Sequence, residues 1–295
     1  MVHRLHSTGQ RAAIVTGAGN GLGAAFADAL ADAGVAVLVN NRRHADRPHS
    51  ALAVVAAIEA QGGTAVPDGH SVDRPDAAAA MIAAALAAFG RLDILVLNAG
   101  IAGPAIKIGA GVTLLADVMA TNFFANVRLV EAALPYLLAG PAGRIVFVSS
   151  TGGLYGVRGR AAYAASKGAV NGWALSLADE LRGTPVRVNV IAPYAETRMT
   201  AQPQRVADPR LDPAGAAAAL VHLCDPAMSR TGEIWVAGAG HVRAARAMES
   251  RALPAGKFAA QAATLAAMPD AKSYHGGEAA FADFYIEATG TAGKL

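Results

Sequence analysis

Short runs of valine, leucine and isoleucine alternate with alanine-rich stretches along most of this chain. Each run is apolar at consecutive positions, which is typical of a strand buried on both faces of a parallel sheet. The stretches between the runs are long enough to form helices that cover such a sheet. The sequence therefore predicts an α/β fold: a doubly wound, seven-stranded parallel sheet of the Rossmann type, with ligands at the carboxyl ends of the strands. The expected strands cover residues 12–16, 35–40, 64–66, 92–97, 144–149, 186–191 and 234–236.

The chain is expected to divide into three parts. Residues 1–10 have no apolar stretch and predict a disordered N-terminal tail. The 295 residues are 54% hydrophobic, which is ample for one large core in the Rossmann-type domain expected over residues 11–240. Residues 241–295 predict two or three helices and no strand. We treat them as a helical C-terminal extension, because the segment is too short for a good core of its own.

Composition argues against several classes of protein. Lys and Arg exceed Asp and Glu by only three (25 − 22), and no basic block is longer than Arg42-Arg43, so no nucleic-acid partner is expected. The longest apolar run, residues 77–89, is shorter than the ~20 residues of a transmembrane helix, so no membrane partner is expected. A single cysteine, Cys224, excludes an intrachain disulfide and fits a cytoplasmic location. The eight histidines show no paired spacing, so no metal is expected.

A glycine-rich segment lies between the first expected strand and the first helix, where residues 16–23 read TGAGNGLG. In that position Gly17 allows a tight turn, Gly21 lets the backbone approach a pyrophosphate, and Gly23 allows close packing of helix on strand. The N–H groups of the helix that follows can then bind the phosphates. The segment predicts a dinucleotide site; a plain tight turn is the alternative.

The second expected strand ends in Asn40-Asn41-Arg42-Arg43. An acidic side chain at this place would bind the ribose hydroxyls of NAD(H) and repel a 2′-phosphate. Asn41 is neutral, and the guanidinium groups of Arg42 and Arg43 match the geometry of a phosphate. We therefore expect NADP(H) to be favoured, with NAD(H) as the alternative cofactor. Two solvated surface arginines are the other interpretation.

Tyr163 and Lys167 are four residues apart, so both lie on one face of the helix expected there. A free tyrosine has a pKa of ~10, and a nearby ammonium group lowers the pKa of the phenol toward neutrality. Ser150 stands just past the fifth strand, where its hydroxyl can face a ligand, and Asn122 is a polar residue inside an apolar helical stretch that needs a buried partner. A Tyr-x-x-x-Lys pair alone also occurs by chance.

Together these residues resemble the short-chain dehydrogenase/reductase family, in its form with Thr-Gly-x-x-x-Gly-x-Gly and Tyr-x-x-x-Lys. Asn98-Ala99-Gly100 also matches the family's Asn-Asn-Ala-Gly, except that Leu97 replaces the first Asn. The resemblance implies a catalytic set of Asn122, Ser150, Tyr163 and Lys167. It implies cofactor contacts from Gly17, Asn20, Gly21, Leu22, Gly23, Asn41, Arg42, Arg43, Ser71, Val72, Asn98, Ala99, Gly100, Tyr163, Lys167, Pro193 and Thr197.

The same resemblance implies a role for each catalytic residue. Tyr163 is the general acid–base, and Ser150 orients the reacting oxygen. Lys167 lowers the pKa of Tyr163 and binds the nicotinamide ribose. Asn122 helps to hold a water that links Lys167 to solvent.

One departure from the common family pattern points to a subgroup. Residues 191–200 read IAPYAETRMT, and residues 154–156 read LYG. Both runs resemble the (3R)-hydroxyacyl-CoA dehydrogenase modules of the peroxisomal multifunctional enzymes of type 2. Those modules carry a ribose-binding Asp where this chain has Asn41. The implied reaction moves a hydride between a nicotinamide cofactor and a secondary alcohol or ketone, with a 3-hydroxyacyl or 3-ketoacyl thioester as one candidate substrate.

Two other functions remain open. One is a reductase of another carbonyl: a steroid, a polyol or a small ketone. The other is a non-catalytic scaffold that senses NAD(P). For assembly, the resemblance implies a homodimer, with a tetramer second. The extension is expected to pack over the surface of the last strand or over the substrate cleft, and its expected anchors are Phe258, Phe281, Phe284 and Tyr285.

Overall fold

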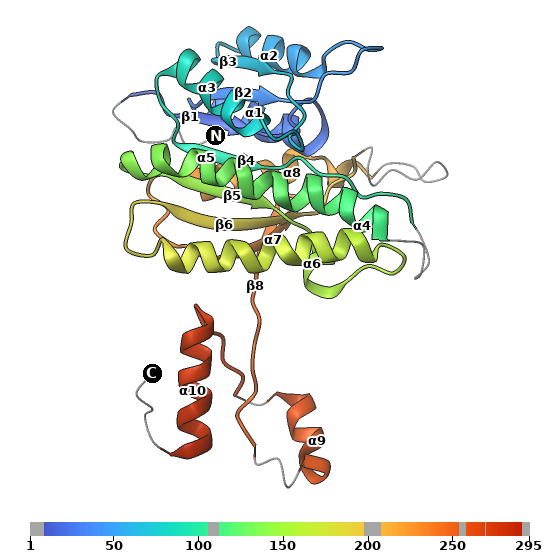
Figure 1. Ribbon diagram of the computed structural model, residues 1–295, viewed down its shortest axis with the longest axis vertical. Helices are drawn as coiled ribbons and strands as arrows, with labels where there is room; N and C mark the ends of the chain where they lie inside the picture. Colours follow the sequence, from blue (N-terminus) through green and yellow to red (C-terminus); the bar gives the residue numbers. More distant parts are fainter. Residues whose placement is uncertain (1–8, 106–111, 198–207, 254–257, 269, 291–295) are drawn as a thin grey trace. The chain divides into compact units, whose positions relative to one another are not determined.

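A computed structural model describes residues 9–105, 112–197, 208–253, 258–268 and 270–290. Most of the disordered tail expected over residues 1–10 therefore lies outside the described residues. The chain divides into two compact units, residues 1–244 and 245–295. The first unit is a single twisted sheet with helices on both faces (Figure 1). This arrangement confirms the predicted α/β class.

The sheet has the strand order β3-β2-β1-β4-β5-β6-β7-β8. All six neighbouring pairs from β3 to β7 are parallel. The strands are β1 (Ala12–Val15), β2 (Ala36–Asn40), β3 (Ala65–Asp68), β4 (Ile94–Leu97), β5 (Arg144–Val148), β6 (Arg187–Pro193), β7 (Ile234–Gly238) and β8 (His241–Ala245). The order reverses between β1 and β4, which is where ligands bind in doubly wound sheets.

The eighth strand corrects two expectations: a seven-stranded sheet, and no strand beyond residue 240. Strand β8 follows β7 at the edge of the sheet, and four of its five residues are exposed. An edge strand of this kind lacks the continuous apolar run that marks a strand buried on both faces. Its sequence, HVRAA, therefore carried little signal.

Helices cover both faces of the sheet. Helices α1, α2 and α8 pack over the side chains of alternate strand residues, such as Val15, Val39 and Val146, in the main apolar core. Helices α3, α5 and α7 cover the other face. The helices of the first unit are α1 (Gly21–Asp32), α2 (Ser50–Ala60), α3 (Ala77–Phe89), α4 (Val112–Met119), α5 (Ala125–Ala139), α6 (Gly152–Tyr155), α7 (Ala161–Glu180) and α8 (Ala214–Cys224), with a 3₁₀ turn η2 (Pro209–Leu211).

The single helix expected over residues 112–138 is interrupted. A π-turn, η1 (Ala120–Phe124), separates α4 from α5. Such turns shift the backbone hydrogen bonds by one residue and are frequent at functional sites. This one contains Asn122.

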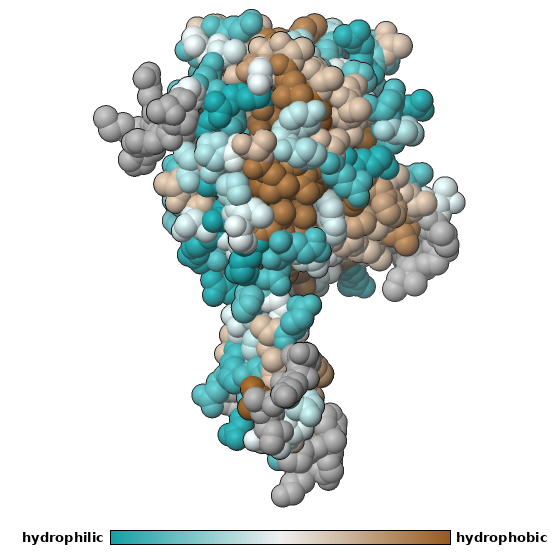
Figure 2. Space-filling model, turned by 60° about the vertical axis from the view of Figure 1, so that its left-hand side comes forward, coloured by the Kyte–Doolittle hydropathy of each residue, from teal (hydrophilic) through white to brown (hydrophobic). Residues whose placement is uncertain are grey.

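Apolar side chains also reach the surface of the first unit. Figure 2 shows them gathered on one face. The exposed large apolar side chains include Phe124 of η1, Tyr136 of α5 and Leu175 of α7. Surface of this kind is common where two protein chains meet.

The second unit contains α9 (Phe258–Ala267) and α10 (Gly277–Thr289). Lys272 joins its parts, because its Nζ lies 2.9 Å from Asp283 and 3.0 Å from Glu287, both on α10. None of its residues whose burial is described is buried. Three of the expected anchors, Phe281, Phe284 and Tyr285, are exposed, and the side chain of Phe258 lies outside the described residues. What this extension packs against stays a prediction.

Buried arginines close the amino-terminal edge of the sheet. Arg144, at the start of β5, is 3% exposed, and burial together with the charge of Arg11 lowers its pKa to about 10. Its guanidinium donates to five backbone carbonyls, at 2.7–3.3 Å: those of Gly143, Pro185, Asp225, Pro226 and Met228. A buried charge is tolerated when hydrogen bonds replace its water. Arg144 therefore fixes the loop after α8 to the edge of the sheet.

We predict that Arg144→Met lowers the free energy of unfolding by about 3 kcal/mol, because the buried carbonyls lose their donor. The matched control is Arg182→Met, which removes an exposed ion pair with Asp179 and should change stability by less than about 0.5 kcal/mol. Urea unfolding followed by circular dichroism measures both values. Equal stability of the two variants would contradict this account of Arg144.

Candidate active site

The glycine-rich turn joins β1 to α1 at the carboxyl edge of the sheet. Gly17 has φ +63°, and a Cβ there would lie 2.9 Å from the Cα of Ala99. A Cβ on Gly23 would collide with the carbonyl oxygen of Gly17. The first residue of α1 follows Asn20, whose side chain makes no capping hydrogen bond. The free N–H groups at this helix end can therefore bind an anion, and the turn fits the pyrophosphate of a dinucleotide.

Asn98 fastens this turn to the end of β4. Its Nδ2 donates to the carbonyls of Thr16 (2.9 Å) and Gly17 (3.2 Å). In return, the hydroxyl of Thr16 accepts from the backbone N–H groups of Asn98 and Ala99, each at 3.0 Å. The two strands on either side of the reversal in strand order are thus joined by four hydrogen bonds.

The ends of β2 and β3 form the next part of the site. Asn40 Nδ2 donates to the carboxylate of Asp68 at 2.6 Å, and His70 Nδ1 lies 2.7 Å from the other oxygen of that carboxylate. Asn41 Nδ2 donates to the Ser50 hydroxyl at 2.7 Å. The carboxylate of Asp68, at the end of β3, is therefore buried and hydrogen-bonded by Asn40 and His70.

The predicted arginines separate from one another. Arg42 lines the cavity at this edge of the sheet, whereas Arg43 does not. The backbone N–H of Arg43 donates to the carbonyl of Gly69 at 3.0 Å, and its Nε lies 3.4 Å from the place a Cβ on Gly69 would take. A third arginine, Arg47, lines the cavity and was missed from the sequence. Its pairing with Asp46 is long, at 3.7 Å, and both side chains are exposed.

Ser150, Tyr163 and Lys167 lie together at the carboxyl edge of the sheet, on the wall of one cavity. The Ser150 hydroxyl lies close enough to the Tyr163 phenol to lower its pKa. Lys167 Nζ lies 5.8 Å from the centre of the Tyr163 ring and donates to the carbonyl of Val148 at 2.8 Å. The positions just after β5 and on the first turns of α7 therefore converge as predicted from their spacing.

The electrostatics of this group differ from the expectation. Burial raises the pKa of Tyr163, and the nearby Ser150 hydroxyl and the charge of Arg160, which lower it, offset this only in part. Burial also lowers the pKa of Lys167 to about 8. The predicted lowering of the Tyr163 pKa by Lys167 is thus not seen. Desolvation acts on both groups and disfavours the charged form of each.

Asn122 also departs from its expected surroundings. It is fully buried in η1 and does not line the cavity. Its Oδ1 accepts from the backbone N–H of Ile101 at 2.8 Å, while its Nδ2 donates to the Ile101 carbonyl at 2.9 Å and to the Ser166 hydroxyl at 2.9 Å. Its amide thus fixes the loop after β4 to α7.

A cavity of about 800 Å³ runs along this edge of the sheet and unites the parts described above. Every predicted site residue lines it except Arg43 and Asn122. The residues that the sequence did not single out are Asn40, His44, Arg47, His70, Asp73, Ile101, Thr121, Val148, Ser149, Thr151, Tyr194 and Ala195. Most of them lie at or just after the carboxyl end of a strand. Their position after the predicted strands could therefore have identified them as site residues.

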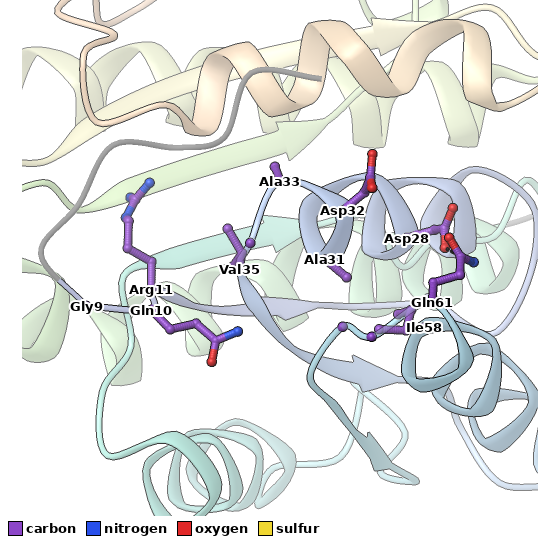
Figure 3. A pocket seen from close by; sticks show the side chains of 13 residues that line it. Gly9, Gln10, Arg11, Asp28, Ala31, Asp32, Ala33, Val35, Ile58 and Gln61 are labelled. Carbon is purple, nitrogen blue, oxygen red and sulfur yellow. Dashed lines mark hydrogen bonds between the residues drawn. The ribbon is translucent and has the colours of Figure 1, made fainter. Parts of the chain in front are cut away.

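A second cavity, of about 490 Å³, lies at the opposite ends of the strands (Figure 3). Its wall includes Asp28 and Asp32 of α1, and Gln61, which donates to Asp28 at 3.2 Å. The predicted site residues do not line it.

Among the residues that the structure describes, no helix is long and apolar enough to cross a membrane. The same residues contain no cluster of three or more histidine, cysteine or acidic side chains that could hold a metal ion.

Comparisons with known proteins agree with this geometry. Residues 11–206 match the family model of short chain dehydrogenases. The peroxisomal multifunctional enzyme type 2 of Mus musculus is 32% identical over 244 residues, which are 79% of this chain and 32% of that protein. A 3-oxoacyl-[acyl-carrier-protein] reductase of Synechocystis is 36% identical over 189 residues, 64% of this chain and 75% of that protein.

A crystal structure of a short chain dehydrogenase from Mycobacterium avium is similar, with a TM-score of 0.77 and 33% identity over 88% of this chain and 95% of that one. The chain spans only about a fifth to a half of the length of the peroxisomal relatives. The family match, the strand order and the convergence of Ser150, Tyr163 and Lys167 lead to one conclusion. This chain belongs to the short-chain dehydrogenase/reductase family.

Proposed function

We propose that the protein interconverts a secondary alcohol and a ketone with NADP(H), and that its substrate is a 3-hydroxyacyl or 3-ketoacyl thioester. The observation that carries the proposal is that one cavity holds both the glycine turn and the side chains of Ser150, Tyr163 and Lys167. When bound, the nicotinamide supplies or accepts the hydride. The glycine turn and the uncapped start of α1 would hold its pyrophosphate.

In the direction of reduction, the carbonyl oxygen accepts hydrogen bonds from Ser150 and Tyr163. As the carbonyl carbon gains a hydride, its oxygen gains negative charge, and the Tyr163 hydroxyl gives it a proton. The raised pKa of Tyr163 keeps that proton in place until the charge develops. In oxidation the same steps run backwards, and the deprotonated Tyr163 accepts the proton of the alcohol.

Lys167 acts on both Tyr163 and the cofactor. Its ammonium group is buried, 5.8 Å from the centre of the tyrosine ring, and would bind a ribose hydroxyl of the nicotinamide half of the cofactor. As negative charge develops on the Tyr163 oxygen, a protonated Lys167 stabilises it. With a pKa of about 8, Lys167 is mostly charged at neutral pH.

The thioester substrate is supported by two likenesses. The Synechocystis relative is named a 3-oxoacyl-[acyl-carrier-protein] reductase, and two short runs resemble hydroxyacyl-CoA dehydrogenase modules. Residues 198–200 of the longer run lie outside the described residues. Reduction of a steroid, polyol or small ketone is the second candidate; the non-catalytic scaffold is disfavoured by the intact Ser150–Tyr163–Lys167 set.

The preference for NADP(H) is supported by charge at the end of β2. Arg42 and Arg47 line the cavity, Asn41 is neutral, and the Asp68 carboxylate is occupied. Asp73 also lines this wall and would oppose a phosphate, but it accepts a hydrogen bond from Ser71 at 2.6 Å. We assign the 2′-phosphate to Arg42 and Arg47 in place of the expected Arg42 and Arg43.

We further propose that the chain works as a cytoplasmic homodimer, with a tetramer as the alternative. The exposed apolar side chains of η1, α5 and α7 support an interface. Some relatives carry peroxisomal names, so the compartment stays a prediction. Partners of other kinds, nucleic acid and membrane included, are not proposed.

We predict that Tyr163→Phe lowers kcat at least ~100-fold, because positioned acid–base catalysis contributes about 10²–10⁴-fold. The Kd for cofactor should change less than twofold, since the ring stays in place. Steady-state kinetics on 3-ketoacyl thioesters and fluorescence titration of the cofactor measure the two effects. The control is Tyr136→Phe on the exposed side of α5, which should behave as wild type. Near-wild-type turnover of Tyr163→Phe would refute the mechanism.

The lowered pKa of Lys167 predicts a rise in stability with pH. Below pH 8 the lysine is charged in both the folded and the unfolded chain, and folding bears the cost of burying that charge. Above the unfolded value of 10.5 it is neutral in both, and the cost is gone. Between these values the wild type should gain about 3 kcal/mol relative to Lys167→Met. Urea unfolding of both proteins from pH 7.5 to 10.5 tests this, and parallel curves would show that the lysine is not desolvated.

The cofactor assignment predicts different effects for two neighbouring arginines. Arg47→Ala should raise the Kd for NADPH about tenfold, the equivalent of one charge-assisted contact of ~1.4 kcal/mol, and leave the Kd for NADH unchanged. Arg43→Ala, the matched control, should stay within threefold of wild type for both. Isothermal titration measures all four values. Wild-type protein that binds NADH tenfold tighter than NADPH would exclude the preference, and a larger effect at Arg43 would exclude the assignment.

A further inference from the structure

A chain of buried hydrogen bonds runs behind the catalytic tyrosine. Asn122 Nδ2 donates to the hydroxyl of Ser166 at 2.9 Å, and that hydroxyl donates to the backbone carbonyl of Tyr163 at 2.8 Å. Asn122 and Ser166 are both 0% exposed. A serine hydroxyl has one hydrogen to donate, so donation to Tyr163 leaves it only as an acceptor toward Asn122. The direction of each bond in the chain is therefore fixed.

The other end of this chain of hydrogen bonds is anchored in the π-turn. The side-chain amide of Asn126 donates to the backbone carbonyl of Asn122 at 2.7 Å, where the regular helical hydrogen-bond pattern is broken. The remaining amide groups of Asn122 bond the backbone N–H and carbonyl of Ile101. Any shift of Asn122 would leave a buried polar atom unpaired, so this end of the chain is rigid.

These hydrogen bonds fix the position of the first turn of α7. The helix begins at Ala161, and the residue before it, Arg160, makes no side-chain capping hydrogen bond. Lys167 is held separately, one turn later, by its bond to Val148 and by the Ser149 hydroxyl, which donates to its carbonyl at 3.3 Å. Ser166 therefore adds a buried hydrogen bond to the support that the turn carrying Tyr163 receives from the packing of α4, η1 and α6 on α7.

We propose that Ser166 is a positioning residue: it transmits the rigid geometry of the π-turn to the backbone of Tyr163 and so holds the tyrosine hydroxyl against Ser150. The inference rests on the proposed function, in which Tyr163 is the acid–base group. It adds to the catalytic set a residue that touches neither substrate nor cofactor and does not line the cavity. Its effect should appear in the chemical step and not in binding.

The test compares full-length Ser166→Ala with Ser176→Ala, which removes an exposed serine of the same helix. Ser166→Ala should lower kcat about tenfold, because small misplacements of reacting groups cost up to ~100-fold, while KM and the Kd for cofactor stay within twofold. Ser176→Ala should match wild type in all three. Crystal structures of both variants should show the Tyr163 hydroxyl displaced from Ser150 in the first and unmoved in the second.

Three results would overturn the inference: a kcat for Ser166→Ala within twofold of wild type, an equal loss of cofactor affinity, or an equal effect in Ser176→Ala. The crystal structures keep the test independent of the proposed function. If wild-type protein turned over no ketone, the proposed function would fail. An unmoved Tyr163 in Ser166→Ala would still overturn the positioning role by itself.

Discussion

The close contact between the ends of β1 and β4 is the constraint on which the rest of the site depends. Gly17 and Gly23 leave no room for side chains there, and Asn98 and Thr16 fill the junction with four hydrogen bonds. This junction lies where the strand order reverses, so it opens the cavity above the sheet. It also directs the uncapped start of α1 toward the place of the pyrophosphate. A side chain at either glycine would close the cradle and separate the two strands.

Desolvation is the second physical theme of the site. Tyr163 is partly buried and Lys167 is buried. Desolvation raises the pKa of the tyrosine and lowers the pKa of the lysine, so it disfavours the charged form of each. The protonation of Tyr163 and of Lys167 therefore depends more on the charges next to each side chain than on bulk solvent. When hydride transfer places negative charge on a bound carbonyl oxygen, that oxygen becomes a strong acceptor for the Tyr163 proton. The Tyr163–Lys167 pair therefore suits proton transfer coupled to hydride transfer.

Much of the fold and of the site could be predicted from the sequence, because both depend on local patterns. Strands buried on both faces have continuous apolar runs, and the glycine turn and the Tyr163–Lys167 pair have fixed spacing. The exposed strand β8 lacks such a run. The π-turn at Asn122 and the separation of Arg43 from Arg42 depend on tertiary contacts, such as that of Asn122 with Ile101 or of Arg43 with Gly69. The pKa of Tyr163 is raised because its side chain is desolvated, and residue spacing in the sequence does not reveal desolvation.

The central claim is that one cavity brings a nicotinamide and a ketone together for direct hydride transfer. The measurement that tests it most directly is a single turnover of the full chain with NADPH carrying deuterium on the transferred position, with 3-ketoacyl thioesters as substrates. The account predicts one equivalent of NADPH oxidised per carbonyl reduced, with the deuterium on the new carbinol carbon. Oxidation without label in the alcohol, or no oxidation with thioesters, steroids, polyol precursors and small ketones alike, would contradict it.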